Sequence, residues 1–290
     1  MKKFFVTFAD SRLNKALLRI QNQAENLNFF DATFIYSEHN LDKNFLEDFN
    51  GKLSPGARGF GFWCWKPQVI IQLLNKMSLN DYLVYADAGC HLNKNGSHRF
   101  YDYFSLADQS ETGIVGFRFP NDFPHLCFGQ KLLTRCDYQW TKGDVFDYFN
   151  VRHDPDITHT PMYNAGAIII KKKKNTLKFF NQWLNAIKED FNLINNSPSR
   201  SLNFEGFIEH RHDQSIYSIL CKKNNVQAID FFELCPRSHE DPKTYKNYDS
   251  WLDLNSFPIH ARRDKFSFFM KQLDRLRRLP SILKRLVAVR

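Results

Sequence analysis

The sequence predicts an α/β fold in which helices cover a mixed, mostly parallel β-sheet. Strand-like and helix-like segments alternate from residue 2 to residue 231, as they do in βαβ units. The strand-like segments are continuous in apolar residues, for example DYLVYA at 81–86, which is typical of strands buried on both faces. A chain of 290 residues with 43% hydrophobic residues can also form one large core.

Each element follows from its own local pattern. Short apolar runs rich in β-branched and aromatic residues predict strands at 2–9, 29–37, 81–87, 112–119, 165–172 and 226–231. Apolar residues at helical spacing predict helices at 10–27, 66–77, 175–191 and 210–224. Asp10 or Ser11 is suited to cap the first helix, and Pro67 suits the first turn of the second. A glycine-rich loop at 54–65 precedes that second helix.

The positive charge is concentrated at the C-terminal end. Residues 261–290 hold ten Lys or Arg and two Asp, so they carry +8 of the net charge of +9. Apolar residues recur at helical spacing among the basic ones, which is typical of a helix on an anionic membrane surface. A helix docked on the protein with a solvated basic face is the alternative. We expect one domain over residues 1–262 and a basic amphipathic tail over residues 263–290 that binds the membrane. The nearly neutral body predicts no nucleic-acid partner.

The cysteines and the N-terminus predict the compartment. The six cysteines form no Cys-x-x-Cys pair, which favours a reducing compartment. Asp10 interrupts the first apolar run too early for a signal peptide. No run approaches the roughly 18 apolar residues of a membrane-spanning helix. We therefore expect a cytoplasmic protein that is peripheral on the inner face of the cytoplasmic membrane.

Four stretches contain the residues most suited to chemistry. They are RGFGFWCWKP at 58–67, YADAGCHLN at 85–93, YNAGAIII at 163–170 and HRHDQS at 210–215. In combination they resemble a family of bacterial capsule and lipopolysaccharide glycosyltransferases, and more distantly the family 8 and family 32 transferases of the GT-A fold. The resemblance covers about residues 1–265. It implies a GT-A-like fold and transfer of a sugar from a nucleoside diphosphate, with UDP favoured and the configuration retained. The acceptor it implies is a bacterial surface glycan or glycolipid, such as lipopolysaccharide or capsule.

Asp87 lies where a buried strand gives way to a glycine turn. This is the carboxyl edge of a parallel sheet, where open α/β folds bind their ligands. The resemblance implies that Asp87, Ala88 and Gly89 bind the donor and that Asp87 binds a divalent cation, Mn²⁺ or Mg²⁺, which offsets the charge of the leaving diphosphate. GT-A enzymes usually have Asp-x-Asp here, and the second acid is missing. A simple turn acid is the alternative. Candidates for the remaining ligands are His91, Asn93 and His260.

The glycine-rich stretch offers two basic residues for phosphate. Arg58 can bind an anion through two parallel N–H groups, and Lys66 can act as a point charge. The glycines let the backbone approach a ligand closely. We therefore expect Arg58 and Lys66 to bind the donor. Trp63 and Trp65 are either core residues or part of the site.

The resemblance assigns the stretch YNAGAIII to the donor-sugar pocket. Asn164 can both donate and accept hydrogen bonds, so its amide is suited to bind sugar hydroxyls. Ala165 and Gly166 would form the adjacent pocket wall, because a glycine lets that wall come close. A plain turn into a strand is the alternative.

Asp213 and Gln214 open the predicted helix 210–224. The resemblance puts this pair beside the anomeric carbon. A negative group there stabilises oxocarbenium character in a retaining enzyme, and an inverting enzyme needs a base on the opposite face. Asp213 and Gln214 are therefore the predicted catalytic residues. Helix capping explains Asp213 equally well, and the spacing of His210 and His212 favours a shaping role over metal binding.

Two further groups rest on the resemblance alone. GT-A folds usually contact the nucleotide base and ribose with the loop after the first strand, which here offers Thr7, Asp10 and Arg12. In related retaining enzymes a late histidine reaches the metal and a nearby basic residue holds the diphosphate. His260 and Arg262 match that pattern, although a single histidine after an apolar run is also often structural.

The prediction is therefore a nucleotide-sugar-dependent glycosyltransferase. Its partners would be a nucleotide-sugar donor, a glycan or glycolipid acceptor and an anionic membrane surface. A nucleotide-sugar hydrolase or a nucleotidyltransferase with the same pocket is an alternative within enzymes. A non-catalytic peripheral membrane protein that kept the fold is an alternative of another class.

Overall fold

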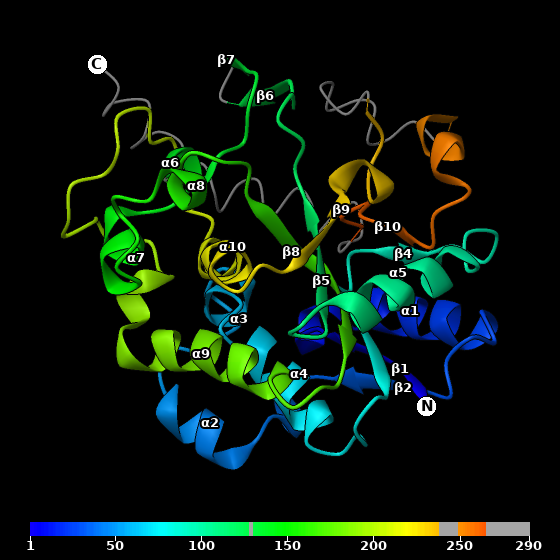
Figure 1. Cartoon of the computed structure of the whole chain (residues 1–290). Coiled ribbons are helices and arrows are strands. Elements are labelled where there is room, and N and C mark those ends of the chain that lie inside the picture. Colours follow the sequence, from blue (N-terminus) through cyan, green and yellow to red (C-terminus); the bar gives the residue numbers. More distant parts are fainter. Residues whose placement is uncertain (128–129, 238–248, 265–290) are drawn as a thin grey trace.

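The computed structural model describes residues 1–127, 130–237 and 249–264. Its centre is a six-stranded sheet in the order β2-β1-β3-β8-β5-β9 (Figure 1). These strands are β1 (Lys3–Phe8), β2 (Ala32–Tyr36), β3 (Tyr82–Ala86), β5 (Ile114–Arg118), β8 (Tyr163–Lys171) and β9 (Gln227–Asp230). All six predicted strands are confirmed, with ends shifted by at most three residues.

One strand of the six runs against the others. β1 is parallel to β2 and β3, and β5 is parallel to β9. β8 pairs antiparallel with both β3 and β5, so that Ile169 lies opposite Val84 on one side and Val115 on the other. The predicted fold class, a mixed and mostly parallel sheet flanked by helices, is confirmed.

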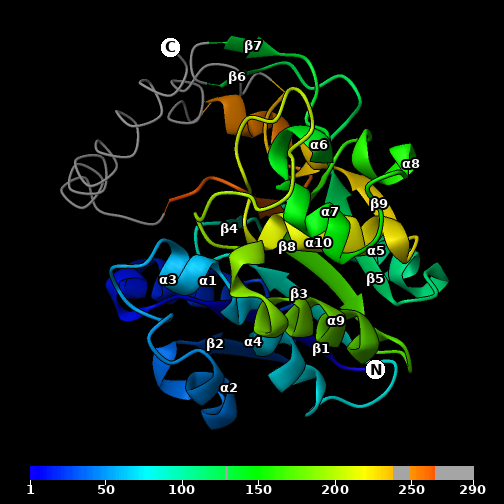
Figure 2. The same cartoon turned by 90° about the vertical axis from the view of Figure 1, so that its left-hand side faces the viewer.

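Helices cover both faces of this sheet (Figures 1 and 2). One face carries α2 (Lys43–Asp48), α4 (Trp65–Leu74), α9 (Thr176–Glu189) and α10 (Asp213–Lys223), and the other carries α1 (Asn14–Asn26) and α5 (Arg99–Gln109). The four predicted helices correspond to α1, α4, α9 and α10 and are confirmed.

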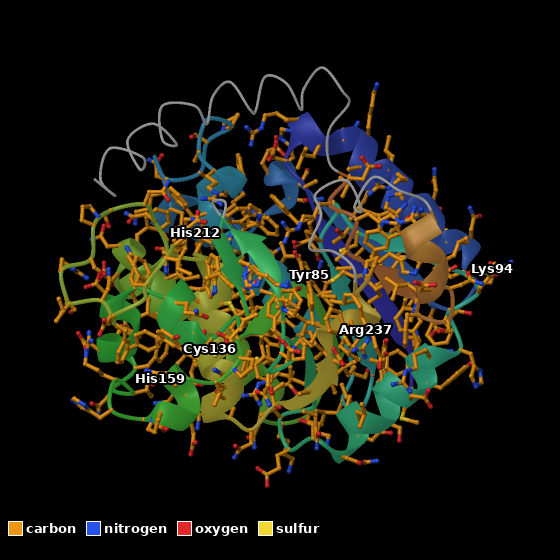
Figure 3. All side chains as sticks on the ribbon, turned by 90° about the horizontal axis from the view of Figure 1, so that it is seen from above. Tyr85, Lys94, Cys136, His159, His212 and Arg237 are labelled. Atoms are coloured by element: carbon orange, nitrogen blue, oxygen red, sulfur yellow. The ribbon has the colours of Figure 1, made fainter. Side chains whose placement is uncertain are left out.

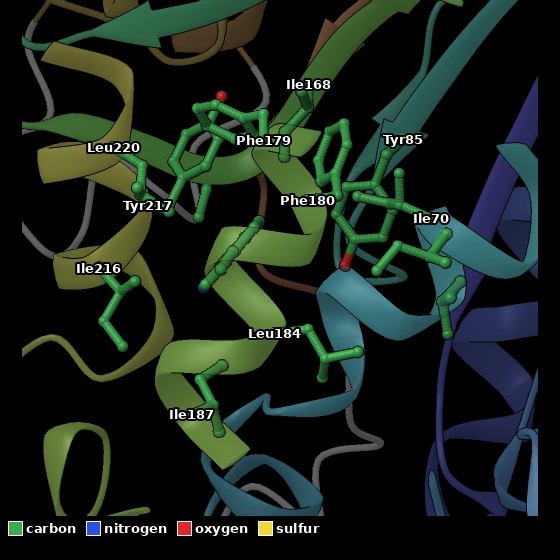
Figure 4. Packing of buried hydrophobic residues seen from close by; sticks show 14 of the residues in the cluster. Ile70, Tyr85, Ile168, Phe179, Phe180, Leu184, Ile187, Ile216, Tyr217 and Leu220 are labelled. Atoms are coloured by element: carbon green, nitrogen blue, oxygen red, sulfur yellow. The ribbon is translucent and has the colours of Figure 1, made fainter. Parts of the chain in front are cut away.

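Helix α9 forms the middle of the core on its face. Figure 4 shows Phe179, Phe180 and Leu184 of α9 between α10, with Tyr217, and α4, with Ile70. All five side chains are buried. Burying an aromatic or aliphatic side chain stabilises the fold by about 1.5–3 kcal/mol, so this packing fixes α4 and α10 relative to the sheet.

The other elements are short. The helices are α3 (Gly59–Phe62), α6 (Asp137–Trp140), α7 (Gly143–Tyr148) and α8 (Pro155–Thr158), with 3₁₀ turns at Ser11–Leu13, Glu38–Asn40, Phe191–Leu193, Phe231–Glu233 and Asp249–Leu254. Two small antiparallel pairs join β4 (His91–Leu92) to β10 (Ile259–His260) and β6 (His125–Cys127) to β7 (Gln130–Leu132).

The last described segment folds back onto the loop after β3. The backbone N–H of Asp264 donates to the carbonyl oxygen of Gly89 at 3.0 Å, and Arg19 of α1 donates to the carbonyl oxygens of Ala88 and Cys90 at 2.8 and 2.9 Å. The predicted tail lies outside the described residues from position 265 onward. Within the described ranges, none of the helices is long and apolar enough to cross a bilayer.

The order of the strands locates the edge at which a ligand is expected. β1 lies between β2 and β3, so the chain crosses to one side of β1 for β2 and to the other side for β3. Open α/β sheets bind ligands at the carboxyl ends of strands where the strand order reverses in this way. Here that point lies between the ends of β1 and β3, and Asp87 is the first residue after β3.

Candidate active site

Lys66 joins two carboxylates from distant parts of the chain. Its Nζ lies 2.9 Å from Oδ2 of Asp213 and 3.3 Å from Oδ1 of Asp87, and it donates to the carbonyl oxygen of Ala165 at 2.9 Å. The side chains of Lys66 and Asp213 are only 4% and 6% exposed, whereas that of Asp87 is 23% exposed. Lys66, Asp87 and Asp213, called the Lys66 cluster below, are thus buried ions that reach solvent through Asp87.

Asp87 is held by its own strand and by the neighbouring one. Its backbone N–H donates to the carbonyl oxygen of Gly166 of β8 at 2.8 Å. The hydroxyl of Tyr85 donates to its Oδ1 at 2.6 Å, because residues two apart on a strand point to the same face. Tyr85 is fully buried and lies near the middle of the molecule (Figure 3). The carboxylate is therefore fixed from the core side.

Lys66 lies in the first turn of α4, directly after an unusual backbone segment. Residues 59–63 all have positive φ, with Phe60 at 53°, Phe62 at 55° and Trp63 at 62°. A left-handed conformation costs an L-residue about 1–2 kcal/mol. The predicted glycine-rich loop is thus a strained left-handed turn, and strain of this kind gathers at functional sites.

The two tryptophans of this stretch have different surroundings. Trp65 is buried, stacks on Phe8 of β1 with ring centroids 4.0 Å apart, and donates its indole N–H to the carbonyl oxygen of Gly59 at 2.9 Å. Trp63 is half-buried, and a Cβ on Gly59 would lie 2.4 Å from its indole ring. Trp65 is therefore a core residue, and Gly59 is needed because the Trp63 ring packs directly on it.

A polar group lies beside the cluster. The amide of Asn164 donates to Oε1 of Gln214 at 3.3 Å, and its Oδ1 accepts from the N–H of Gly166 at 2.8 Å. A Cβ on Gly166 would lie 2.8 Å from Oδ1 of Asn164 and 3.6 Å from Oδ2 of Asp87. A glycine is therefore needed at 166, because a side chain there would press on the amide oxygen of Asn164. Asn164, Gly166 and Gln214 are all half-buried.

Asp213 is placed by the start of α10 and by two histidines before it. Nδ1 of His212 donates to the carbonyl oxygen of Ile194 at 2.6 Å, and Nε2 of His210 donates to that of Leu193 at 2.8 Å. His212, the residue directly before α10, has a φ of 57°. It is labelled in Figure 3. Both rings are buried, and burial lowers the pKa of His212 to about 3. The two neutral imidazoles thus tie residues 193–194 to the end of α10 that carries Asp213.

Burial and mutual attraction set the charges of the cluster. Burial raises the pKa of Asp213 to about 6 against the attraction of Lys66, and the charge of Asp87 adds to the rise. Burial alone would lower the pKa of Lys66, but the carboxylates of Asp213 and Asp87 outweigh it and raise the pKa. Burial and the adjacent Asp87 also hold the pKa of Tyr85 well above its usual value. Near neutral pH the cluster holds one ammonium and two carboxylates, a net charge of −1.

The residues near the first loop that were predicted to bind the nucleotide are buried or make contacts within the protein. Thr7 is fully buried within β1. Asp10 accepts from Nε and Nη2 of Arg12 at 2.7 and 2.9 Å, and Arg12 also donates to the carbonyl oxygen of Pro55. Asp10 and Arg12 therefore join the loop after β1 to the loop that precedes α3.

Arg58 lies at the side of the cluster. Its guanidinium donates to Glu209 at 3.3 Å and lies over the Trp63 ring at 5.8 Å. Glu209 also pairs with Arg211 at 3.6 Å. The ring of Trp63 in turn lies 5.7 Å from that of His212, the neighbour of Asp213. Arg58 is thus part of a second charged group that borders the Lys66 cluster.

His260 and Arg262 make contacts near the end of the described chain. Nε2 of the buried His260 donates to the carbonyl oxygen of Leu254 at 2.9 Å, so this nitrogen is not placed to bind a metal. The guanidinium of Arg262 lies over the Trp251 ring at 5.0 Å. Ala88 and Gly89 contribute the carbonyl oxygens that hold the loop after β3 to α1 and to residue 264.

The residues of the cluster fit the divalent cation that the resemblance implies. Carboxylate oxygens are the ligands that Mg²⁺ and Mn²⁺ favour, and the cluster retains a net negative charge on its exposed member, Asp87. Among the residues that the structure describes, no group of three or more His, Cys, Asp or Glu side chains is arranged to hold a metal. A cation here would thus take Asp87 as its protein carboxylate, with phosphate oxygens and water as further ligands.

Two surface hollows of the described structure lie elsewhere. The larger is lined by residues that include Arg118, Asp154, Tyr163 and Lys222, and the smaller by residues that include Gln182 and Glu189. Neither contains a predicted site residue.

Tyr85 was not predicted, although the two-residue repeat of a strand puts it on the same face as Asp87. The contact of Glu209 with Arg58 joins residues 151 positions apart, so no local pattern signals it.

Comparison with known proteins gives similarity at the level of structure only. No protein-family model matches the chain, and no curated protein sequence is similar to it. The chain is similar to a glycosyltransferase involved in glycosylation of the major capsid of PBCV-1, with 10% identity and a TM-score of 0.48 over 91% of this chain and 98% of that one. It is also similar to the galactosyltransferase LgtC, with 12% identity and a TM-score of 0.44 over 89% and 86%. A third similar structure, with 9% identity and a TM-score of 0.36 over 79% and 50%, is the bifunctional IspDF of Campylobacter jejuni. With these low identities and scores, the proposal below depends on the chain's own residues.

Proposed function

We propose that this protein is a GT-A-like glycosyltransferase that transfers a sugar from a nucleoside-diphosphate sugar, with UDP favoured. One observation carries the proposal. Asp87 at the end of β3, Asp213 at the start of α10 and Lys66 at the start of α4 form one ion cluster, at the strand ends where α/β sheets bind ligands. Asn164 and Gln214 lie beside it.

The roles of the residues follow from their chemistry and exposure. Asn164 and Gln214 would bind sugar hydroxyls, since their amides can donate and accept and are half-buried. Gly166 would let the Asn164 amide keep its position next to Asp87, since a side chain at 166 would displace the amide oxygen. Asp87 would hold the divalent cation, which when bound supplies positive charge for the leaving diphosphate.

Retention of configuration is part of the proposal. Asp213 is 6% exposed, and its Oδ2 is paired with Lys66. A side chain in this position is poorly placed to take a proton from an acceptor hydroxyl, as an inverting enzyme requires. Its negative charge can still stabilise oxocarbenium character at the anomeric carbon. The amide of Gln214 would orient the sugar beside it.

The acceptor that we propose is a bacterial surface glycan or glycolipid, such as lipopolysaccharide or capsule. The basic tail supports this, because a cationic amphipathic segment favours an anionic membrane surface and lipid-linked acceptors lie there. The protein would thus work at the inner face of the cytoplasmic membrane. These parts of the proposal rest on the sequence.

Ligand-induced stabilisation tests the donor site directly. Binding to the folded state raises the melting temperature, so UDP with Mn²⁺ should raise that of the wild type and not that of D87A. D264A, which removes a 47%-exposed carboxylate in the segment that holds the loop after β3, is the control. Release of free nucleotide from a panel of nucleotide sugars would then identify the donor. If no nucleoside diphosphate shifts the melting temperature, the proposal is wrong.

A further inference from the structure

We propose that Lys66 is a positioning residue, which holds Asp87 in place for the cation and does not itself bind the diphosphate. The proposal rests on the function proposed above. It replaces the prediction from sequence alone, in which Lys66 contacts the phosphate or the sugar of the donor.

The hydrogen-bonding capacity of Lys66 is the first argument. A lysine ammonium has three N–H donors and no acceptor. Three oxygens lie around Nζ, from Asp213 at 2.9 Å, Ala165 at 2.9 Å and Asp87 at 3.3 Å. With 4% of its side chain exposed, the ammonium of Lys66 is enclosed by these three oxygens. A phosphate could bind this nitrogen only by displacing one of the three.

The restraint on Asp87 is the second argument. Lys66 and the hydroxyl of Tyr85 both approach Oδ1 of Asp87, at 3.3 and 2.6 Å. Tyr85 comes from the same strand and Lys66 from α4, so the carboxylate is fixed by two separate elements. A cation ligand that is fixed in advance loses little conformational freedom when it binds.

The second carboxylate is the third argument. The segment Asp87-Ala88-Gly89 lacks the second acid of Asp-x-Asp, and Asp213 supplies another carboxylate from 126 positions further along the chain. The ammonium of Lys66 lies between the two carboxylates, 3.3 Å from Asp87 and 2.9 Å from Asp213. It therefore fixes the position of Asp87 relative to Asp213.

A second buried lysine gives a matched control. Lys222 lies in α10, the helix that begins with Asp213. Its ammonium pairs with the fully buried Asp137 at 2.5 Å and donates to the carbonyl oxygens of Ile157 and Thr160 at 2.7 and 2.9 Å. Its side chain is 5% exposed. It lies nine residues after Asp213, about 13 Å along the helix. K222M removes a buried ammonium from a similar setting away from the cluster.

The experiment measures the affinity for UDP by calorimetry, in EDTA and in MnCl₂, for the wild type, K66M and K222M. We expect Mn²⁺ to strengthen UDP binding by the wild type and by K222M. K66M should lose about tenfold of affinity or more in Mn²⁺ and be unchanged in EDTA. Y85F, which removes the other restraint and leaves the ammonium in place, should give the same pattern with a smaller loss, and it decides the matter if K66M does not fold.

The other outcomes separate the two proposals. An equal loss for K66M in EDTA and in Mn²⁺ would make Lys66 a phosphate ligand, and an unchanged affinity in both would leave it without a role in binding. Either result overturns the positioning role, as does a wild type that binds UDP equally with and without Mn²⁺. If the wild type binds none of UDP, GDP, CDP and ADP under either condition, the proposed function is itself wrong and this inference with it.

Discussion

Replacing Asp213 with Asn should remove a dependence of stability on pH between 4 and 7. Asp213 has a pKa of about 6 in the folded protein, chiefly because of burial, against an ordinary value of 3.8. The folded state thus binds a proton more tightly than the unfolded chain does. Stability must then fall as pH rises between these values, which is the reverse of the usual behaviour of a salt-bridged carboxylate.

The magnitude follows from the two pKa values. Each unit of difference corresponds to about 1.4 kcal/mol, and the carboxylate passes from mostly protonated to mostly ionised in the folded state between pH 4 and pH 7. The wild type should therefore lose about 2 kcal/mol relative to D213N over this interval. The Asn side chain keeps the shape, and Lys66 retains Asp87 and Ala165 as partners.

Urea denaturation at several pH values measures this difference. D147N is the matched control, because the guanidinium of Arg152 lowers the pKa of Asp147 to about 2. The free-energy difference between wild type and D147N should stay constant from pH 7 down to about pH 5 and shrink progressively below that. If the difference for D213N is constant or grows with pH, Asp213 is an ordinary stabilising ion-pair partner and the electrostatic description of the cluster is wrong.

Three further outcomes follow from other parts of the molecule. G59A should lower the melting temperature, since its Cβ would meet the Trp63 ring at 2.4 Å and its φ is +60°, whereas G56A, with only a contact at 3.9 Å, should change it little. G166A should weaken binding of a UDP-sugar about tenfold or more relative to its effect on UDP, because its Cβ would lie 2.8 Å from the oxygen of Asn164; an equal effect on both ligands would contradict a sugar-binding role. The full-length protein should sediment with vesicles that contain anionic lipid, and the protein without its C-terminal tail should not; equal sedimentation of both excludes the membrane role of the tail.

The strands were predictable because burial on both faces leaves a plain apolar signal. Val84, Ile169 and Val115 are register partners on the adjacent strands β3, β8 and β5, and each lies in a continuous apolar run. The antiparallel direction of β8 was not predictable in the same way, since direction is set by how the chain returns to the sheet. Helix α5 was missed although Phe100, Tyr103, Phe104 and Ala107 are buried at helical spacing. This spacing is that of an amphipathic helix, so α5 was predictable from the sequence.

The grouping of the site residues was only partly predictable. Asp87 was predicted to lie at a strand end, and Asp213 and Gln214 to open a helix, and the structure has both features. The contact between Asp87 and Asp213 through Lys66 depends on three elements packing together, which no local pattern reports. Arg12 and Arg262 were assigned to the donor by the resemblance, and the structure pairs the first with Asp10 and stacks the second on Trp251. These internal contacts depend on the tertiary fold, which the sequence pattern does not report.

The position of Lys66 is unfavourable for folding, and this supports a functional reason for it. The first turn of a helix is the positive end of its dipole, where a cation is disfavoured by about 0.3–1 kcal/mol. Replacing a buried ion pair by well-packed apolar residues is often neutral or stabilising by about 1–4 kcal/mol. The left-handed turn at residues 59–63 adds strain directly before it. These costs are adjacent, at the sheet edge that carries Asp87. A core built for stability alone would have apolar residues in place of Lys66 and both carboxylates, so the presence of this ion cluster is best explained by what the two carboxylates do when they are held together.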